Sequence, residues 1–473
     1  MRRILGVLMV VLATILLAWT ILVGPWPVEN VSPTSEPAYR STLSRLAGRA
    51  AALPEPVAAP LSAGWSRVPI TPAVPTNTAG YGKVTARRVN DSVYVRALAL
   101  RVDTSEAILI GADILIVSRQ MSDRVRSALA YSLGIAGGHV YFTATHTHSG
   151  PGNWSPDFLG KQFAGRYDPA RLDTIVAAMS RAAHEAHAAL APAEMAYGSF
   201  SAPSYVRNRL LGTATHVDST FVWAAFRHRD GGMAVWGRFS AHATTIGDRA
   251  AMISGDYPGV WERELEARTA EVALFSAGAV GSMSPRGSRH DYERAQAVGM
   301  PLADSVRAHV ARAPWSSTVR LLAYRLPMDL PPNQMRLQRI LASGKWRISP
   351  LLAGRLVPIR STALSVLALN RLVLAGMPCD LSGELSREIA ASAEARGFLL
   401  ATTSFGGDYI GYVLPDRHDR IDNYETRTMS WWGPHMGSFL ADVARRSIAV
   451  AMDRIAAAET TPAEPTSSPA AER

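Results

Sequence analysis

Two histidines separated by one residue offer the clearest chemistry in this sequence. His146 and His148 lie in the run YFTATHTHSGPG, which covers residues 141–152 and begins with strand-forming residues. Because residues i and i+2 of a strand share one face, we expect both imidazoles to point the same way, with the Ser-Gly-Pro-Gly turn ending the strand at an open rim. Two imidazoles on one face suit a metal ligand and a neighbouring acid or base. The alternative is a pair of ordinary strand histidines.

Three further stretches place a polar residue at the end of an apolar run. They are FSAHATT around His242, AGAVGSMSPR around Ser284 and LAGMPCDLSGE around Asp380. Taken singly, a histidine after a strand is more often structural than a ligand, and a small-residue turn is more often only a turn. Asp380 follows a predicted strand and precedes a predicted helix, so it is either a helix N-cap or a ligand.

The elements that must position these residues alternate between strand and helix. Apolar runs predict strands, and spacing of 3.6 residues predicts helices, the first of which is capped by Ser118. The expected strands cover 93–102, 107–117, 139–148 and 233–246, and the expected helices cover 118–135 and 168–190. This succession predicts an α/β (or α+β) fold, a single large layered domain with mixed sheets. The Arg-rich range 321–370 is either an insertion that shapes an entrance to a site or simple packing.

The N-terminus predicts export and a membrane anchor. After Met1–Arg3 no charged residue occurs until Glu29, and about 20 apolar residues are enough to span a bilayer as a helix. We interpret residues 1–26 as an uncleaved signal anchor, with a cleaved signal peptide as the alternative, and expect Arg2 and Arg3 on the cytoplasmic side. Residues 27–62 are expected to form a Pro/Ala-rich stem that includes a short helix, residues 63–455 the main domain, and residues 456–473 a disordered tail.

Composition narrows the class of protein further. The formal net charge is +10, but the basic residues are scattered singly, which argues against a nucleic-acid-binding face. A mild attraction to anionic lipid headgroups is consistent with this charge. The single cysteine excludes an intrachain disulfide and any site that needs several cysteine ligands.

In their order along the chain, these stretches resemble the N-terminal catalytic domain of the neutral/alkaline ceramidase family, from about Gly64 to Leu440. The most specific motif is THTHSGPG at 145–152, followed by SGD at 254–256 and GSMSP at 281–285. Tyr412 and Tyr424 precede Gly-Pro-His at 433–435 and resemble the family's pair of active-site tyrosines. The chain is expected to lack the family's C-terminal immunoglobulin-like domain.

The resemblance implies one zinc ion per chain, and it implies roles for eight residues. The implied metal ligands are His146, His242, Asp380 and Tyr412, and the implied catalytic residues are His148, Ser284, Tyr424 and Arg209. Arg207 competes with Arg209 for the position of the substrate-contacting arginine.

The sequence departs from the family pattern at the expected carboxylate ligand. The family's zinc-binding Glu closes a Pro-Gly-Glu turn, whereas residues 378–380 here read Pro-Cys-Asp. Asp380 keeps the carboxylate but is one methylene shorter, so the backbone must lie closer to the metal. Glu384 is the weaker substitute. Ser282 also stands where the family usually has an acidic residue.

The N-terminus and the resemblance together predict an exported, membrane-anchored zinc amidohydrolase, with its domain on the periplasmic or extracellular side. It would cleave the N-acyl amide of a ceramide-like or other N-acyl lipid by zinc-activated water, assisted by Tyr, Arg and His side chains. Ser284 is the alternative nucleophile. The alternative functions are hydrolysis of a non-lipid amide or ester, and a catalytically silent relative that binds lipid or cell-wall material.

Overall fold

Two stacked β-sheets form the centre of the molecule. A computed structural model of the chain describes residues 2–82, 84–212, 216–336 and 344–460. The larger sheet has nine strands, of which eight run in the order β15-β13-β12-β10-β2-β6-β7-β8 while β17 pairs with β2 at one side. Its strands are β2 (Ala59–Pro69), β6 (Tyr94–Val102), β7 (Ser105–Ala112), β8 (Val140–Ala144), β10 (Ala191–Ser201), β12 (Thr220–His228), β13 (Met233–Phe239), β15 (Val272–Ala277) and β17 (Thr318–Val319). The smaller sheet has the order β18-β20-β21-β23, with strands β18 (Leu321–Asp329), β20 (Ser361–Leu369), β21 (Leu372–Gly376) and β23 (Leu399–Thr403).

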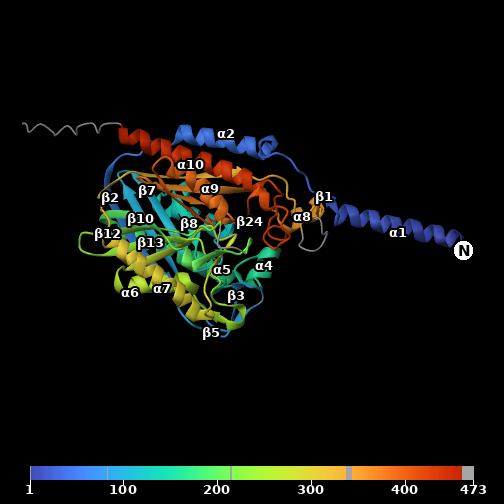
Figure 1. Cartoon of the computed structure of the whole chain (residues 1–473), viewed down its shortest axis with the longest axis horizontal. Coiled ribbons are helices and arrows are strands. Elements are labelled where there is room, and N and C mark those ends of the chain that lie inside the picture. Colours follow the sequence, from blue (N-terminus) through green and yellow to red (C-terminus); the bar gives the residue numbers. More distant parts are fainter. Residues whose placement is uncertain (1, 83, 213–215, 337–343, 461–473) are drawn as a thin grey trace, which may run out of the picture.

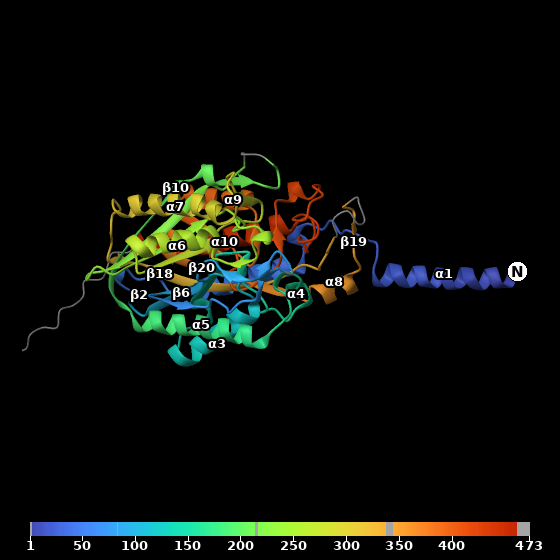
Figure 2. The same cartoon turned by 90° about the horizontal axis from the view of Figure 1, so that it is seen from below.

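Helices cover the outer face of each sheet (Figures 1 and 2). The larger sheet carries α3 (Arg119–Leu133), α5 (Pro169–Ala188), α6 (Asp256–Arg268) and α7 (Asp291–Val310). The smaller sheet carries α2 (Pro37–Ala52), α9 (Gly383–Glu394) and α10 (Met436–Thr460). The result is a layered fold of helices, sheet, sheet and helices. The predicted fold class, a large layered domain with mixed sheets, is confirmed.

The alternation of side chains along β6 explains this layering. Val95, Ala97 and Ala99 pack toward the helices α3 and α5, whereas Leu98 and Leu100 pack toward the smaller sheet. Successive strand residues point to opposite faces, so a strand with apolar residues at nearly every position must be buried on both sides.

The N-terminal segment makes two different helices. The first, α1 (Arg2–Leu22), is long and apolar enough to be a membrane anchor or a signal sequence, and it extends away from the body (Figure 1). The second is the short helix expected within the stem, α2. Its Tyr39 and Leu46 are buried in the core beside α10 and the smaller sheet. At the other end of the chain, α10 continues to Thr460, and residues 461–473 lie outside the described residues.

The range 321–370, which sequence patterns left unassigned, consists of two core strands and an insertion between them. Strands β18 and β20 pair antiparallel along their whole length. Between them lie β19 (Trp346–Arg347), which pairs with β1 (Trp26–Pro27), and α8 (Pro350–Leu356). The described part of the insertion therefore connects the body to the end of α1.

Short strand pairs shape the end of the molecule at which the larger sheet's parallel strands finish. They are β3 (Thr76–Gly80) with β4 (Thr85–Ala86) and β9 (Ser149–Pro151), β5 (Arg88–Val89) with β14 (Met252–Ile253), β11 (Val206–Asn208) with β16 (Met283–Pro285), and β22 (Asp380–Leu381) with β24 (Tyr412–Val413). Three pairs within the main sheets are parallel, namely β7 with β8, β13 with β15, and β21 with β23. The segments that leave the carboxyl ends of these strands carry most of the residues predicted to form a site.

A buried ionic cluster ties the larger sheet to α6, and it generates a stability prediction. Arg96 of β6 lies 2.8 Å from Glu262, 2.9 Å from Glu266 and 3.0 Å from Asp113, and all four side chains are buried. Replacing Arg96 with Met removes the buried cation from these carboxylates and leaves Glu266 with its exposed partner Arg67. We expect Arg96→Met to lower the free energy of unfolding by about 3–5 kcal/mol, measured by chemical denaturation.

Arg67→Met is the matched control, because Arg67 bonds the same Glu266 from an exposed position. Its expected loss is below about 1 kcal/mol. If both variants lose the same free energy of unfolding, burial is not the reason that Arg96 stabilises the fold.

Candidate metal centre and its pocket

The predicted site residues come together where strands of both sheets end. His146 follows the carboxyl end of β8, and His242 follows the end of β13. Asp380 follows β21 and Tyr412 follows β23, and the two lie side by side because Asp380 pairs with Tyr412 in the register of β22 and β24. The loops at the carboxyl ends of parallel strands are the usual place for binding sites in layered α/β folds.

His146 does not lie on a strand, so the expectation that it shares a strand face with His148 is wrong. Strand β8 ends at Ala144, and His146 has a positive φ of 61°, in the left-handed region. The backbone N–H groups of Thr145 and His146 instead donate to Ala112 and Ile114, at the end of β7. This turn nevertheless brings both imidazoles to one point.

The three imidazole rings of His146, His148 and His242 meet through their Nε2 atoms. The Nε2 of His242 lies 2.9 Å from that of His146 and 3.0 Å from that of His148, and the remaining Nε2 pair is 3.4 Å apart. Ligand nitrogens of a tetrahedral zinc site, at about 2.05 Å from the ion, are about 3.3 Å from one another. These spacings are close to those of a metal site.

The protonation of two rings is fixed by backbone carbonyls. Nδ1 of His146 donates to the oxygen of Leu115 at 2.7 Å, and Nδ1 of His242 donates to the oxygen of Val280 at 3.2 Å. A carbonyl only accepts, so each Nδ1 carries the hydrogen and each Nε2 keeps its lone pair. Burial lowers the pKa of His146 to about 3 and the pKa of His242 well below its ordinary value. Two neutral rings thus direct lone pairs at each other, an arrangement that a cation stabilises.

His148 differs from the other two histidines. Burial also lowers its pKa, but within the described part of the chain its Nδ1 is buried without a hydrogen-bond partner. Its ring packs against Tyr81 at 4.7 Å and contacts the position of Gly80, where a Cβ would lie 2.5 Å from the imidazole. This close backbone approach requires glycine at position 80. Because no described residue bonds Nδ1 of His148, the tautomer of its ring is not fixed.

Asp380 adds a carboxylate to the histidines. One oxygen, Oδ1, lies 3.5 Å from Nε2 of His146 and accepts no hydrogen bond from the described residues. The other oxygen, Oδ2, accepts a 2.7 Å hydrogen bond from Tyr409. Burial raises the pKa of Asp380 to about 7, although Tyr409 and Arg209 act in the opposite direction. A buried carboxylate oxygen without a donor, facing imidazole lone pairs, completes a donor set that fits a divalent metal.

Helix capping does not explain Asp380. The N-cap of α9 is Ser382, whose hydroxyl accepts from the N–H of Leu385. Glu384, the weaker candidate ligand, is engaged elsewhere, because its carboxylate accepts hydrogen bonds from Asn208 at 2.7 Å and from Ser282 at 2.5 Å. Ser282, which stands where the family usually has an acidic residue, thus donates to Glu384.

The structure places the two candidate arginines differently. Arg209 donates to the hydroxyl of Tyr412 at 3.0 Å and pairs with Glu425 at 3.0 Å, so it lies beside the metal centre. Arg207 donates to Oγ of Ser284 at 3.1 Å, because β11 and β16 pair these two residues in register. Arg209 therefore lies beside the candidate metal centre, and Arg207 lies beside Ser284.

Tyr412 and Tyr424 stand next to each other at the pocket wall. Their rings are 6.2 Å apart and nearly perpendicular. Tyr412 is buried, whereas Tyr424 is 39% exposed. Burial raises the pKa of Tyr424 to about 12 and that of Tyr412 well above its ordinary value. At neutral pH, and before any cation binds, both phenols are protonated.

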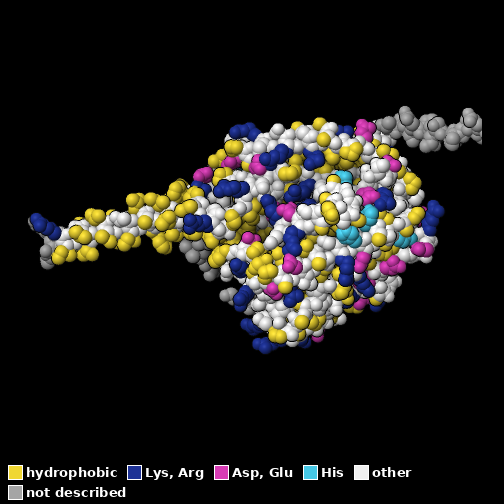
Figure 3. Space-filling view, turned by 180° about the vertical axis from the view of Figure 1, so that it is seen from behind, with side chains coloured by type: hydrophobic (Ala, Val, Ile, Leu, Met, Phe, Trp, Pro, Cys, Tyr) yellow, Lys and Arg dark blue, Asp and Glu magenta, His cyan; other side chains and the backbone are white. Residues whose placement is uncertain are grey.

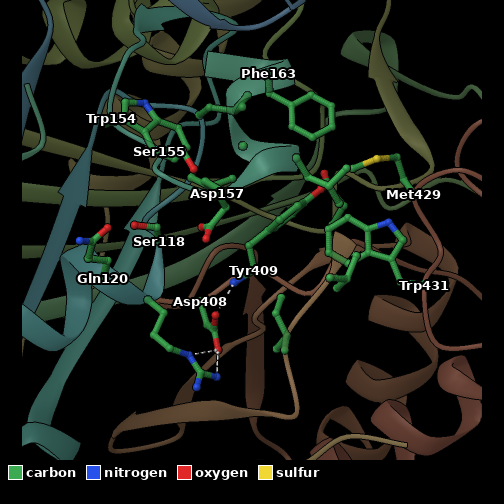
Figure 4. A pocket seen from close by; sticks show the side chains of 18 of the residues that line it. Ser118, Gln120, Trp154, Ser155, Asp157, Phe163, Asp408, Tyr409, Met429 and Trp431 are labelled. Carbon is green, nitrogen blue, oxygen red and sulfur yellow. Dashed lines mark hydrogen bonds and ion pairs between the residues drawn. The ribbon is translucent and has the colours of Figure 1, made fainter. Parts of the chain in front are cut away.

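A pocket of about 670 Å³ adjoins the metal centre. His146, His148, Asp380 and Tyr412 line it together with residues of α4 (Phe158–Ala164), α8 and the loops between β23 and α10. Figure 4 shows Met429 and Trp431 on one side of this pocket, Trp154 on the other, and Tyr409 and Phe163 between them. Most of this lining is apolar, which suits a hydrocarbon chain more than a polar ligand.

Sequence reasoning missed two residues that hold the centre together. Tyr409 orients Asp380, and Phe405 stacks on the ring of His146 at 4.2 Å. Both lie in the glycine-containing loop 404–411, in which Phe405 adopts a positive φ of 64°. The glycines at 406, 407 and 411 were the signal available in the sequence.

The fold and site thus define a layered α/β protein with a histidine-rich centre that could hold a metal ion. Residues 62–297 match the family model "Neutral/alkaline non-lysosomal ceramidase, N-terminal". The resemblance predicted from the motifs is confirmed.

Two curated relatives and two solved structures resemble the chain. Neutral ceramidase of Mycobacterium tuberculosis is 28% identical over 236 residues, covering 44% of this chain and 37% of that protein. Neutral ceramidase of Pseudomonas aeruginosa is 27% identical over 164 residues, covering 31% and 24%. The chain thus matches well under half the length of either relative. A crystal structure of the Pseudomonas aeruginosa neutral ceramidase has a TM-score of 0.70 at 19% identity, covering 86% of this chain and 76% of that one. A ceramidase complexed with C2 gives 0.71 at 18%, with the same coverage, so both show the same fold.

The convergence of the histidines predicts metal binding that depends on particular rings. We expect the protein to bind one divalent ion, and His146→Ala and His242→Ala to lower its affinity at least about tenfold, because each loses a carbonyl-oriented ligand. Metal content after dialysis, measured by mass spectrometry, checks this. His184→Ala on α5 is the control, since the hydrogen bonds of His184 among the described residues go to Ser132 and Ser180. Full occupancy in His146→Ala would contradict the assignment.

Proposed function

We propose that the chain is a zinc-dependent amidohydrolase that cleaves the N-acyl amide of a ceramide-like or other N-acyl lipid. The observation that carries the proposal is the cluster of three imidazole Nε2 atoms and an unpartnered carboxylate oxygen at the end of an apolar pocket. The printed names of both curated relatives, neutral ceramidase, support this substrate class.

His146, His242, Asp380 and Tyr412 are the residues that would hold the zinc. The first two present oriented Nε2 lone pairs, Asp380 presents a free oxygen, and Tyr412 lies beside Asp380 in the β22–β24 register. When bound, zinc supplies a Lewis acid and lowers the pKa of water toward about 7. Asp380 is one methylene shorter than the family's Glu, and Tyr409 offsets this by fixing its second oxygen.

His148 is the residue that would transfer the proton to the leaving amine. Its Nε2 is within 3.4 Å of both other rings, and it lacks the carbonyl acceptor that fixes their tautomers. A ring that can take either tautomer suits a group that accepts and then delivers a proton.

Arg209 and Tyr424 would stabilise negative charge on the carbonyl oxygen of the substrate. Arg209 carries a fixed positive charge beside Tyr412, and Tyr424 keeps its phenolic proton at neutral pH. A donor aimed at a developing oxyanion contributes about 3–4 kcal/mol to the rate.

Ser284 fits a hydrogen-bonding role better than that of a nucleophile. Its Oγ accepts from Arg207, and no described hydrogen bond connects it to a histidine or carboxylate that could remove its proton. A serine nucleophile needs such a base. We therefore prefer an activated water as the nucleophile.

The proposed location follows from α1. If α1 remains uncleaved as an anchor, Arg2 and Arg3 stay in the cytoplasm and the body lies on the extracytoplasmic side. A bilayer-resident substrate is consistent with this arrangement.

Released fatty acid measures the proposed activity directly. We expect the full-length protein in detergent to release fatty acid from a short-chain ceramide, and a chelator to abolish the release until zinc is restored. His146→Ala should be inactive under all these conditions, and His184→Ala should be active.

Each negative outcome of this assay has a definite meaning. Cleavage restricted to water-soluble amides or esters would favour a non-lipid hydrolase, and lipid binding without turnover would favour a silent relative. Full activity in metal-free protein would end the zinc proposal.

Substitution of His148 separates proton transfer from metal binding. We expect His148→Ala to keep the zinc content of the unmodified protein while kcat falls by about 10²–10⁴ and KM changes little. Metal analysis and steady-state kinetics on the same preparation check this. Loss of zinc comparable to that in His146→Ala would make His148 a ligand instead.

A further inference from the structure

The point where α1 leaves the body is fixed by contacts with the start of α8. Ser349, the N-cap of α8, donates its hydroxyl to the oxygen of Leu22 at 2.6 Å and its N–H to the oxygen of Val23 at 2.8 Å. Strand β1 pairs with β19, and the N–H of Val28 donates to the oxygen of Lys345 at 2.8 Å. The end of α1 and the first turn of α8 are therefore in direct contact.

Exposed apolar side chains lie near this contact between α1 and α8. We use the name apolar rim for Trp346, Leu351 and Phe158, whose side chains are 42%, 50% and 59% exposed. Trp346 belongs to β19 and Leu351 to α8, so both are within a few residues of Ser349. Phe158 begins α4, which lies on the same side of the body as α8 in both views (Figures 1 and 2).

The two helices that carry the rim also form walls of the pocket. Helix α8 lines it through Leu356, and α4 lines it through Leu159 and Phe163. Helix α8 has 7 residues, and at 1.5 Å per residue it is roughly 10 Å long. Leu356, at the far end of α8 in the pocket wall, thus lies about the length of α8 from the end of α1.

Basic side chains accompany the apolar rim. Lys161 on α4, Lys345 beside β19 and Arg355 on α8 are exposed. Figure 3 shows Lys and Arg side chains gathered where the apolar helix α1 meets the body. Apolar side chains flanked by cations are the pattern expected of a surface that enters the headgroup layer of an anionic membrane.

We propose that the apolar rim and these basic residues dock on an anionic phospholipid bilayer, so that the pocket opens toward the membrane that holds α1. A lipid amide would then pass from the bilayer into the pocket between α4 and α8 without crossing water. The docking depends on α1 remaining in the membrane, and the passage of substrate also depends on the proposed function.

Labelled cysteines test the docking independently of catalysis. The single native cysteine, Cys379, is buried, so a polarity-sensitive fluorophore can be attached to Phe158→Cys or Leu351→Cys in the full-length protein. Tyr131→Cys is the control, because Tyr131 is 95% exposed on α3, at the end away from the pocket. In phosphatidylcholine vesicles containing phosphatidylglycerol, we expect a blue shift and quenching by nitroxide lipids at the rim only, both weaker without phosphatidylglycerol.

A comparison of two substrates tests the passage. We expect the double variant Phe158→Ser, Leu351→Ser to lose roughly tenfold in turnover of a long-chain ceramide in vesicles, and to keep its turnover of a short-chain ceramide in detergent. Neither residue lines the pocket, and Tyr131→Ser should change neither rate.

The outcomes separate the two proposals. Rim labels that stay water-like in vesicles would overturn the docking, whatever the enzyme does. Labels that become buried in detergent as protein concentration rises, and not in vesicles, would assign the rim to a second copy of the chain and also overturn it. Equal loss of turnover on both substrates would overturn the passage of substrate. If the unmodified protein turns over neither substrate, the proposed function is contradicted and the result with the labels still stands.

Discussion

Two buried imidazole nitrogens that carry lone pairs approach to 2.9 Å, and much of the site serves to hold them there. The rings of His146 and His242 would separate or rotate if they were free, because their lone pairs repel each other. Carbonyl oxygens at Leu115 and Val280 fix their tautomers, and Phe405 stacks on His146 to fix the plane of its ring. Strain of this kind persists only where the surrounding structure determines it, and it is typical of metal and catalytic sites.

The parts of the site that could be predicted from the sequence are those with local signals. His146, His148 and His242 follow apolar runs, and their order with the other motifs along the chain marked them as site residues. The strand through His146 was predicted too long, since the left-handed backbone at His146 depends on hydrogen bonds to the end of β7, about 30 residues away. Periodicity within a short window contains no information about such a contact.

Residues that act through distant partners could not be predicted. Tyr409 is one of 14 tyrosines, and its loop reaches Asp380 through backbone hydrogen bonds to Met377 and Pro378 and through the pairing of β22 with β24. The fold class followed from the alternation of strand and helix, whereas the stacking of the two sheets did not. The insertion between β18 and β20 was also unassigned, because α8 is short and is held by contacts with the end of α1 rather than by its own propensity.

Backbone approach explains how a short carboxylate can serve this centre. A Cβ on Gly281 would lie 2.5 Å from the backbone oxygen of Asp380, and the N–H of Gly281 donates to the oxygen of Leu381 at 2.7 Å. The glycine in the turn before Ser284 therefore lets β22 lie closer than any side chain would allow. Gly281 thus sets the backbone position from which the short side chain of Asp380 reaches the centre.

The charges around the centre also favour a divalent ion over a protonated histidine. Arg209 carries one positive charge beside the two carboxylates of Asp380 and Glu425, so these three groups sum to a single negative charge when all are ionised. A proton on one imidazole would neutralise that charge, but it would have to bind an Nε2 atom between two nitrogens, and burial opposes it. A divalent ion satisfies all the lone pairs at once and leaves one positive charge, which is the sign that an amide oxygen requires as it gains electron density.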